Sequence, residues 1–118
     1  MKKMLIVDDE ESIRTLLTNF FLNKYEIHTA NNGLDAVKLC TKSQFDVVIL
    51  DIFMPVLDGV EAAKAIRITQ PSIKIIAISG IADIEPIKKI KKLNIEAFFE
   101  KPINLNELKK ETDRIINL

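Results

Sequence analysis

The sequence of 118 residues has no tryptophan, one cysteine, three glycines and no excess of charge of either sign. The single Cys40 excludes an intramolecular disulfide, and no group of Cys or His residues has the spacing of a zinc site. Lys and Arg (17) balance Asp and Glu (17), so no overall cationic field favours nucleic acid or an anionic membrane. We therefore expect a cytoplasmic protein that binds neither directly.

Long apolar runs and low-complexity segments are also missing. No apolar run approaches the ~20 residues of a membrane span, and Asp8 to Glu11 end the first apolar run too early for a signal peptide. Neither G-x-G-x-x-G nor G-x-x-x-x-G-K-[ST] occurs, which argues against a nucleotide-binding module. With 47% hydrophobic and 29% charged residues, and no linker or repeat, residues 1–118 are predicted to form one globular domain.

Short apolar runs alternate with longer amphipathic segments, which is the pattern of strand and helix units around a parallel sheet. Several of the short runs are almost continuous Val, Ile and Leu, as is typical of strands buried on both faces. The sequence thus predicts an α/β fold with helices on both faces of the sheet. The predicted strands cover residues 4–7, 25–30, 45–50, 73–78 and 96–99.

The predicted helices carry an apolar stripe or a start signal. A stripe at helical spacing predicts that the first helix packs on the sheet through Ile13, Leu16, Leu17, Phe20 and Phe21. Side chains that accept hydrogen bonds from free N–H groups predict the starts of the later helices, at Asn32, Asp58, Asp83 and Asn104.

Polar and charged residues follow four of the predicted strands. In an open parallel sheet, ligands bind beyond the carboxyl ends of the strands. These ends carry Asp8-Asp9, Asp51, Ser79 and Lys101. Two carboxylates about 4 Å apart repel by roughly 4 kcal/mol at an effective dielectric near 20, so three at one edge need a cation. Oxygen donors favour a hard ion such as Mg²⁺, with Mn²⁺ as a substitute.

A carboxylate nucleophile, a divalent metal, a hydroxyl and an ammonium are the groups needed to accept a phosphoryl group by in-line attack. With these residues in place, the sequence resembles the receiver domain of bacterial two-component response regulators over essentially its whole length. The resemblance is carried by the acidic pair in Ile6 to Glu10, by Asp51 to Pro55 followed by Asp58-Gly59, by Ser79, and by Lys101-Pro102.

The resemblance implies a flavodoxin-like, five-stranded parallel sheet in the order 2-1-3-4-5. It implies that Asp51 becomes an aspartyl phosphate, and that Asp8, Asp9, Asp51 and the backbone carbonyl of Phe53 form the Mg²⁺ site. Such a protein is a signalling switch, not an enzyme with a turnover of its own. It is expected to phosphorylate itself from a donor and to have weak autophosphatase activity.

The resemblance also assigns roles beyond the acceptor. Ser79 and Lys101 bind phosphoryl oxygens, and the Lys101-Pro102 peptide bond is expected to be cis. Ser79 and Phe98 are expected to shift together on phosphorylation. Phe98 stands where the family often has Tyr, so it cannot gain a hydrogen bond when it moves.

Two apolar side chains are expected to flank the path of water to the phosphoryl group. These are Phe53, two residues after Asp51, and Ile81, two residues after Ser79. Neither side chain can orient an attacking water molecule. We therefore expect slow self-dephosphorylation.

The resemblance implies a histidine kinase or a His-phosphotransfer protein as the donor. This donor would dock on Ile13 and Arg14 of the first helix and on Ile103, and also on Leu17 unless that side chain is fully buried. A downstream protein would bind the surface of the fourth helix, fifth strand and fifth helix. The lysines of the fourth helix fit either such a contact or a solvated face: Lys88, Lys89, Lys91 and Lys92.

Other functions fit the residues less well. A phosphatase of the haloacid-dehalogenase kind would need a second Asp where this chain has Phe53. A receiver-like scaffold that binds proteins without being phosphorylated is the alternative that we retain, although the intact set of acidic residues argues against it. His28 lies in a predicted strand far from any other His or Cys, and we expect it to have no chemical role.

Overall fold

The computed structural model describes residues 1–54, 56–80 and 84–117. Over these residues the chain forms a five-stranded parallel sheet in the order β2-β1-β3-β4-β5, as the resemblance implied. The strands are β1 (Lys2–Val7), β2 (Tyr25–Ala30), β3 (Val47–Asp51), β4 (Lys74–Ser79) and β5 (Ala97–Glu100). The helices are α1 (Glu11–Phe21), α2 (Gly33–Lys42), α3 (Gly59–Thr69), α4 (Ile84–Lys91) and α5 (Leu105–Ile116).

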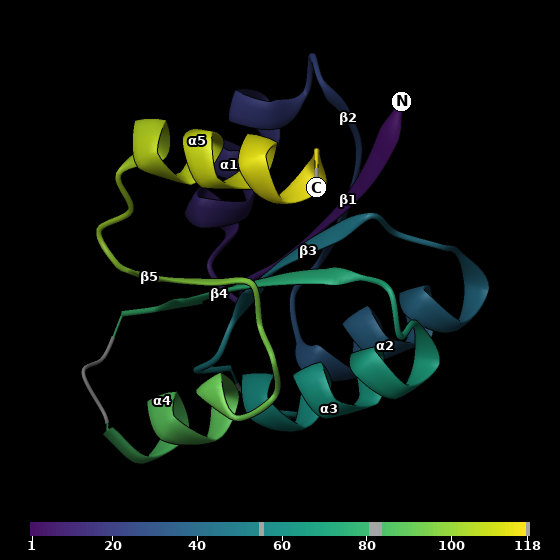
Figure 1. The fold of residues 1–118 in the computed structure, drawn as a ribbon, viewed down its shortest axis with the longest axis vertical. Helices are drawn as coiled ribbons and strands as arrows, with labels where there is room; N and C mark the ends of the chain where they lie inside the picture. The colour runs from purple at the N-terminus through teal and green to yellow at the C-terminus, as the bar shows by residue number, and fades with distance from the viewer. Residues whose placement is uncertain (55, 81–83, 118) are drawn as a thin grey trace.

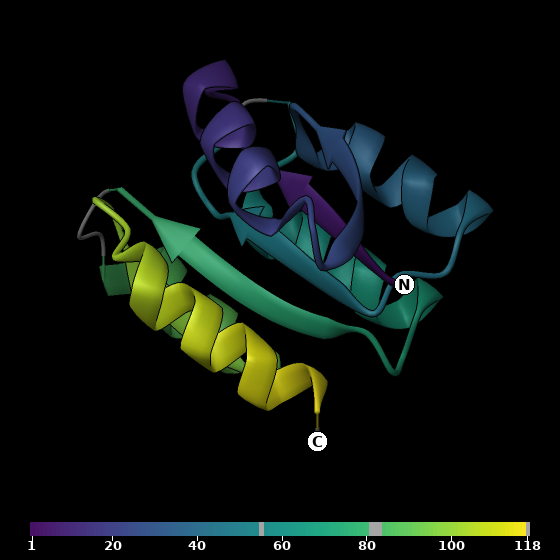
Figure 2. The same ribbon diagram turned by 90° about the horizontal axis from the view of Figure 1, so that it is seen from above.

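The helices cover both faces of the sheet. Helices α1 and α5 lie on one face and helices α2, α3 and α4 on the other (Figure 1), and the twist of the strands is clear from above (Figure 2). No helix in the described ranges is long and apolar enough to cross a bilayer. The carboxyl ends of the strands point to the left of Figure 1, where the connections that carry the predicted site begin.

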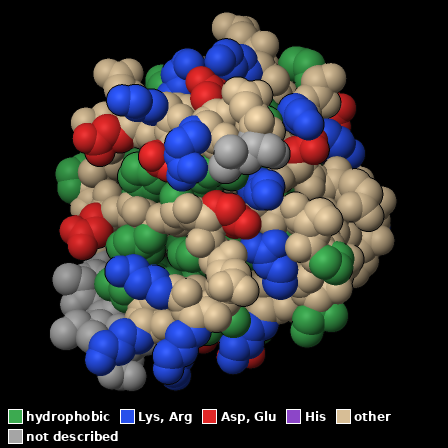
Figure 3. All heavy atoms as spheres, in the orientation of Figure 1, with side chains coloured by type: hydrophobic (Ala, Val, Ile, Leu, Met, Phe, Trp, Pro, Cys, Tyr) green, Lys and Arg blue, Asp and Glu red, His purple; other side chains and the backbone are tan. Residues whose placement is uncertain are grey.

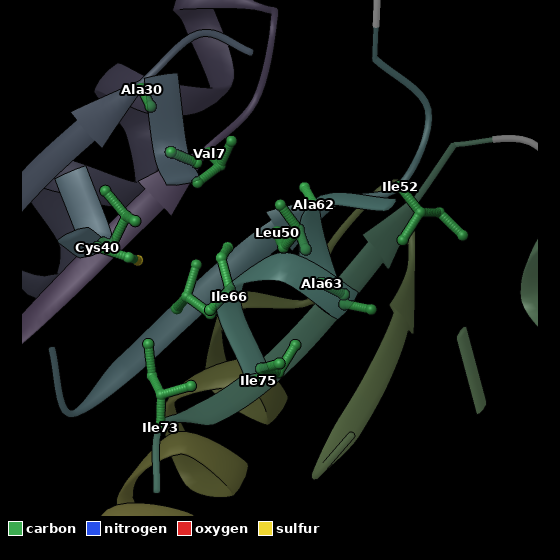
Figure 4. Packing of buried hydrophobic residues seen from close by; sticks show 14 of the residues in the cluster. Val7, Ala30, Cys40, Leu50, Ile52, Ala62, Ala63, Ile66, Ile73 and Ile75 are labelled. Carbon is green, nitrogen blue, oxygen red and sulfur yellow. The ribbon is translucent and has the colours of Figure 1, made fainter. Parts of the chain in front are cut away.

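Alternation along the central strands fills two hydrophobic cores. In β3, Val48 and Leu50 face α2 and α3, while Val47 and Ile49 face α1 and α5. Figure 4 shows the first of these cores, in which Leu50 and Ile75 of the sheet pack against Ile66 of α3. Fully burying each such side chain contributes roughly 1.5–3 kcal/mol. The sheet is therefore a rigid frame for the residues that follow its strands.

Helix α1 buries a narrower stripe than the sequence predicted. Leu17 and Phe21 are buried, and Ile13 and Phe20 are partly buried against the α5 side of the sheet. Leu16, which we predicted to pack there as well, is 46% exposed. It lies at the edge of the stripe, where the curved surface of the helix has already turned away from the sheet.

Three predicted helix starts are confirmed by their capping hydrogen bonds. Asn32, Asp58 and Asn104 each accept a hydrogen bond on a side-chain oxygen from the backbone N–H three residues later, at 2.8, 2.9 and 3.1 Å. The predicted start at Asp83 lies outside the described residues.

The third and fifth strands begin one or two residues later than predicted, and at both starts a side chain takes part in the backbone hydrogen bonding. Phe45 was predicted to begin the third strand, but its N–H donates to Oε1 of the buried Gln70 at 2.9 Å. Glu96 was predicted to begin the fifth strand, and its N–H does donate to the carbonyl oxygen of Ile75 at 2.9 Å, but its carboxylate takes the N–H of Ile75 at 2.6 Å. Both strands therefore begin one or two residues later.

The connection from β3 to α3 packs so closely on its neighbours that two positions require glycine. A Cβ atom on Gly59 would lie 2.6 Å from the carbonyl oxygen of Asp51 and would collide with Cα of Ile52. A Cβ atom on Gly33 would collide with the carbonyl oxygen of Leu57. The two glycines thus hold the segment after Asp51 against the end of the sheet.

One residue of this connection is strained. Val56 has a φ angle of 75° and is 77% exposed. A left-handed conformation costs an L-residue about 1–2 kcal/mol, and glycine adopts it without this penalty, although glycine loses more chain entropy on folding.

We predict that Val56→Gly raises the free energy of unfolding by about 1 kcal/mol, because the strain outweighs the added entropy of the unfolded chain. Urea denaturation would measure the change. Val56→Ala is the matched control, since it keeps the Cβ atom and should gain less. A glycine variant no more stable than the alanine variant would contradict the prediction.

Candidate functional site

The four strand ends bring the predicted residues together at one edge of the sheet. Asp8 follows β1, Asp51 is the last residue of β3, Ser79 is the last residue of β4, and Lys101 follows β5. Asp8, Asp51 and Ser79 are 0%, 2% and 2% exposed, which is rare for such polar residues without a functional or structural partner. Asp9 is exposed at the mouth of the site.

The ammonium group of Lys101 joins the carboxylates of this edge. Its Nζ atom lies 3.0 Å from Oδ2 of Asp8, 3.3 Å from Oδ2 of Asp51 and 3.2 Å from Oε1 of Glu10. The sequence predicted the first two partners but not Glu10. An acidic residue just before an amphipathic helix is also a common helix-start signal, so only the structure separates its contact with Lys101 from that role.

Backbone hydrogen bonds fix the orientation of the two buried carboxylates. Oδ1 of Asp8 accepts the N–H of Glu10 at 2.9 Å, and Oδ1 of Asp51 accepts the N–H of Phe53 at 3.1 Å. Arg14 of α1 donates from Nη1 to the carbonyl oxygen of Asp8 at 2.7 Å. Each carboxylate therefore has one oxygen bound to its own loop and turns the other toward Lys101.

The charges in the site shift the pKa values of Asp51 and Lys101. Burial, together with the charge of Asp8, raises the pKa of Asp51 to about 6, even though the N–H of Phe53 and the charge of Lys101 oppose the shift. Burial by itself lowers the pKa of Lys101, but its contact with Asp8 and the charges of Asp51 and Asp8 outweigh burial and leave that pKa raised. Lys101 thus stays charged, while the ionised form of Asp51 lowers the stability of the folded chain.

The acidic cluster has the composition of a site for a hard cation. Carboxylate oxygens of Asp8, Asp9 and Glu10 lie within 4.8 Å of one another. Oδ2 of Asp8 is buried and makes no hydrogen bond to any described residue, and its ion-pair contact is with Lys101. An oxygen-only donor set with an unsatisfied buried carboxylate oxygen fits Mg²⁺ or Mn²⁺ better than zinc.

The residues predicted to act as a switch lie on two adjacent strands. Ser79 is buried at the end of β4, and Phe98 lies on β5, where it packs on the core formed with α2, α3 and α4. Nζ of Lys91 lies 5.6 Å from the centre of the Phe98 ring. Phe99 faces the opposite core, as the alternation of side chains along a strand requires. Ile81, the second predicted residue on the water path, lies outside the described residues.

Only some of the residues predicted to contact a phosphoryl donor are exposed at the surface. Leu17 is 0% exposed, so it cannot contact a partner and supports the core instead. Arg14 is partly exposed and is tied to the carbonyl of Asp8, and Ile13 and Ile103 are half-buried against the α5 side of the sheet. The structure thus removes Leu17 from this surface and leaves its burial in the core as the correct alternative.

Two other predicted features lie away from the site. His28 is on the edge strand β2, where Nε2 lies 2.8 Å from Glu26 and the ring packs edge-on against Phe45. The lysines of α4 and the adjacent Lys92 are exposed, and basic side chains gather over this helix at the lower edge of Figure 3. They are Lys88, Lys89, Lys91 and Lys92.

The Lys101-Pro102 peptide bond is cis, the isomer that the resemblance implied.

Comparison with known proteins agrees with this geometry. Residues 4–113 match the family model of the response regulator receiver domain. The chain is 32% identical over 118 residues to sporulation initiation phosphotransferase F of Bacillus subtilis, covering 99% of this chain and 95% of that protein. It is 35% identical over 102 residues to chemotaxis protein CheY of Halobacterium salinarum, covering 86% and 85%. It spans only 26% of the length of regulatory protein AtoC of Escherichia coli, with 34% identity.

Solved structures show the same fold. Chemotaxis protein CheY4 of Vibrio cholerae superposes with a TM-score of 0.88 at 32% identity, covering 98% of each chain. The receiver domain of sensor histidine kinase PA1611 of Pseudomonas aeruginosa has a TM-score of 0.88 at 24% identity, covering 99% of this chain and 98% of its own. That domain was solved with a magnesium ion coordinated in its active site cleft.

The raised pKa of Asp51 predicts the effect of removing its charge. Because the pKa is higher in the folded chain than in the unfolded chain, ionised Asp51 destabilises the fold at neutral pH. Asp51→Asn should raise the free energy of unfolding by about 1–3 kcal/mol at neutral pH without divalent cations. The gain should shrink as the pH falls through about 6 and should vanish near pH 4.

Asp113→Asn is the control, because the same substitution there should change the free energy of unfolding in the opposite direction. Contact with Lys109, and then with Lys24, lowers the pKa of Asp113, so neutralising this side chain should reduce stability at neutral pH. Thermal and urea unfolding between pH 4 and 8 would measure both variants. A loss of stability in Asp51→Asn at neutral pH would contradict the electrostatic description of the site.

Proposed function

Because the chain belongs to the family of response regulator receiver domains, we propose that it is a Mg²⁺-dependent signalling switch that accepts a phosphoryl group on Asp51. The observation that carries the proposal is the buried Asp51 carboxylate at the end of β3, with Lys101 at 3.3 Å and the buried Asp8 paired to the same ammonium. A carboxylate held in this way is a nucleophile beside a fixed positive charge. Such a site favours attack on an anionic phosphoryl group.

The transfer would pass from a phosphohistidine of the donor protein to Asp51. A carboxylate oxygen of Asp51 attacks phosphorus and forms the new O–P bond as the P–N bond of the donor breaks. The electron pair of that bond returns to the imidazole nitrogen, and the ring leaves as neutral imidazole because its other nitrogen carries a proton in the reacting phosphohistidine. Lys101 and Ser79 stand at the ends of the neighbouring strands, where they would receive phosphoryl oxygens.

A divalent ion would complete the charge balance of the site. The residues that would hold it are Asp8, Asp9, Asp51 and the backbone carbonyl of Phe53. When bound, Mg²⁺ supplies positive charge that neutralises the carboxylates and the transferred phosphoryl oxygens. The unsatisfied Oδ2 atom of Asp8 and the magnesium ion in the PA1611 receiver domain support this assignment.

The signal would leave through a change in protein binding. We propose a histidine kinase or His-phosphotransfer protein as the donor, and a downstream protein on the surface of α4, β5 and α5. Ser79 and Phe98 lie on the two strands that connect Asp51 to this surface. Phosphorylation changes the output only if the partner binds the two states with different affinity.

Phosphoryl uptake tests the proposal directly. We predict that the intact mass rises by one phosphoryl group when the chain is incubated with Mg²⁺ and acetyl phosphate. No increase is expected for Asp51→Asn or in EDTA, because the nucleophile or the neutralising cation is then lost. If the wild-type chain takes up no phosphoryl group from acetyl phosphate or from phosphohistidine donors, the scaffold alternative replaces the switch.

The lifetime of the phosphoryl group is a separate prediction. Phe53 is apolar and partly buried beside Asp51, and Ile81 is the second apolar residue expected on the path of water. We expect slow self-dephosphorylation, and we expect a Phe53→Asn, Ile81→Glu double variant to lose the group faster because its polar side chains can orient water. Time courses of intact mass after donor removal would measure both rates. A half-life that is unchanged or longer in the double variant would contradict the prediction.

A further inference from the structure

The ammonium group of Lys101 is surrounded by carboxylates: it donates hydrogen bonds to Glu10 and Asp51 and forms an ion pair with Asp8. An ammonium group has three N–H donors and no acceptor. Its Nζ atom has three carboxylate neighbours, Asp8 at 3.0 Å, Glu10 at 3.2 Å and Asp51 at 3.3 Å. If Lys101 is to bind a phosphoryl oxygen, one of these carboxylates must release it.

The three carboxylates differ in what their release would cost. Until the new O–P bond forms on Asp51, the loss of Lys101 would leave a buried charge without its partner, because the side chains of Asp8 and Asp51 are 0% and 3% exposed. The side chain of Glu10 is 58% exposed, and water can replace the ammonium group around its carboxylate. Glu10 is therefore the partner that Lys101 can leave at least cost.

We propose that Glu10 is a positioning residue that holds the Lys101 ammonium at the mouth of the site and yields it to a phosphoryl oxygen during transfer. The inference rests on the proposed phospho-acceptor function. Glu10 then competes with the phosphoryl group for one donor of Lys101. An exposed ion pair of this kind is weak, so its removal should speed uptake by about two- to five-fold.

Two variants of Glu10 separate contact from charge. Glu10→Gln removes the charge, and Glu10→Asp keeps the charge on a side chain one methylene shorter, which draws the carboxylate back from Lys101. We expect both variants to take up phosphoryl from acetyl phosphate faster than the wild type at saturating Mg²⁺, with saturation established for each by calorimetry. Glu11→Gln is the matched control, because it removes a neighbouring exposed charge from the start of α1 and should leave the rate unchanged.

A second measurement follows Lys101 itself without any phosphoryl donor. The ¹⁵N-detected signal of the Lys101 ammonium group should be sharp and slowly exchanging in the wild type and in Glu11→Gln. It should broaden and exchange faster in both Glu10 variants, because the ammonium group has lost one of three partners. This measurement depends on the contact between Glu10 and Lys101 and not on phosphoryl transfer.

Several outcomes would overturn the role of Glu10. Slower or unchanged uptake in Glu10→Gln would show that Glu10 does not compete for Lys101. Wild-type behaviour of Glu10→Asp in both measurements would show that general charge, and not the contact, matters. If the wild type takes up no phosphoryl group, both the proposed function and the role of Glu10 are wrong. If the wild type takes up the group but the Glu10 variants behave like it, only the role of Glu10 is wrong.

Discussion

The site depends on two buried carboxylates that share one ammonium group. Asp8 and Asp51 come from neighbouring strands and are almost fully buried, and Lys101 pairs with both. Buried like charges repel, and a single cation offsets only one of them. The fold therefore holds excess negative charge at a fixed place, which is the property that the proposed binding of a divalent ion requires.

The rest of the chain keeps these charges in place. The register of β1 and β3 places Val7 beside Leu50, so that the residues after them lie at the same level of the sheet edge. Gly59 lets the next connection close over the end of β3, and α1 reaches back through Arg14 to the carbonyl of Asp8. Two apolar cores hold the strands rigid. The residues that follow the strands are therefore held at fixed positions along the sheet edge.

Much of this arrangement could be predicted from the sequence, because it follows from patterns local to each segment. Apolar runs located the strands, and the polar residues after them located Asp8, Asp51, Ser79 and Lys101. The contact of Glu10 with Lys101 was missed because it joins residues 91 positions apart, and no local pattern indicates it. The start of β3 was misplaced for the same reason, since Gln70 takes the N–H of Phe45 from 25 residues away.

In the proposed switch, Asp51 and no other acidic residue of the cluster carries the phosphoryl group. Borohydride reduction of the phosphorylated chain would convert an aspartyl phosphate to homoserine, and peptide mass spectrometry would locate the converted residue. Homoserine is expected at position 51 only, in the presence of Mg²⁺ and a phosphoryl donor. Conversion at Asp8 or Asp9, or at none of the three, would contradict this prediction.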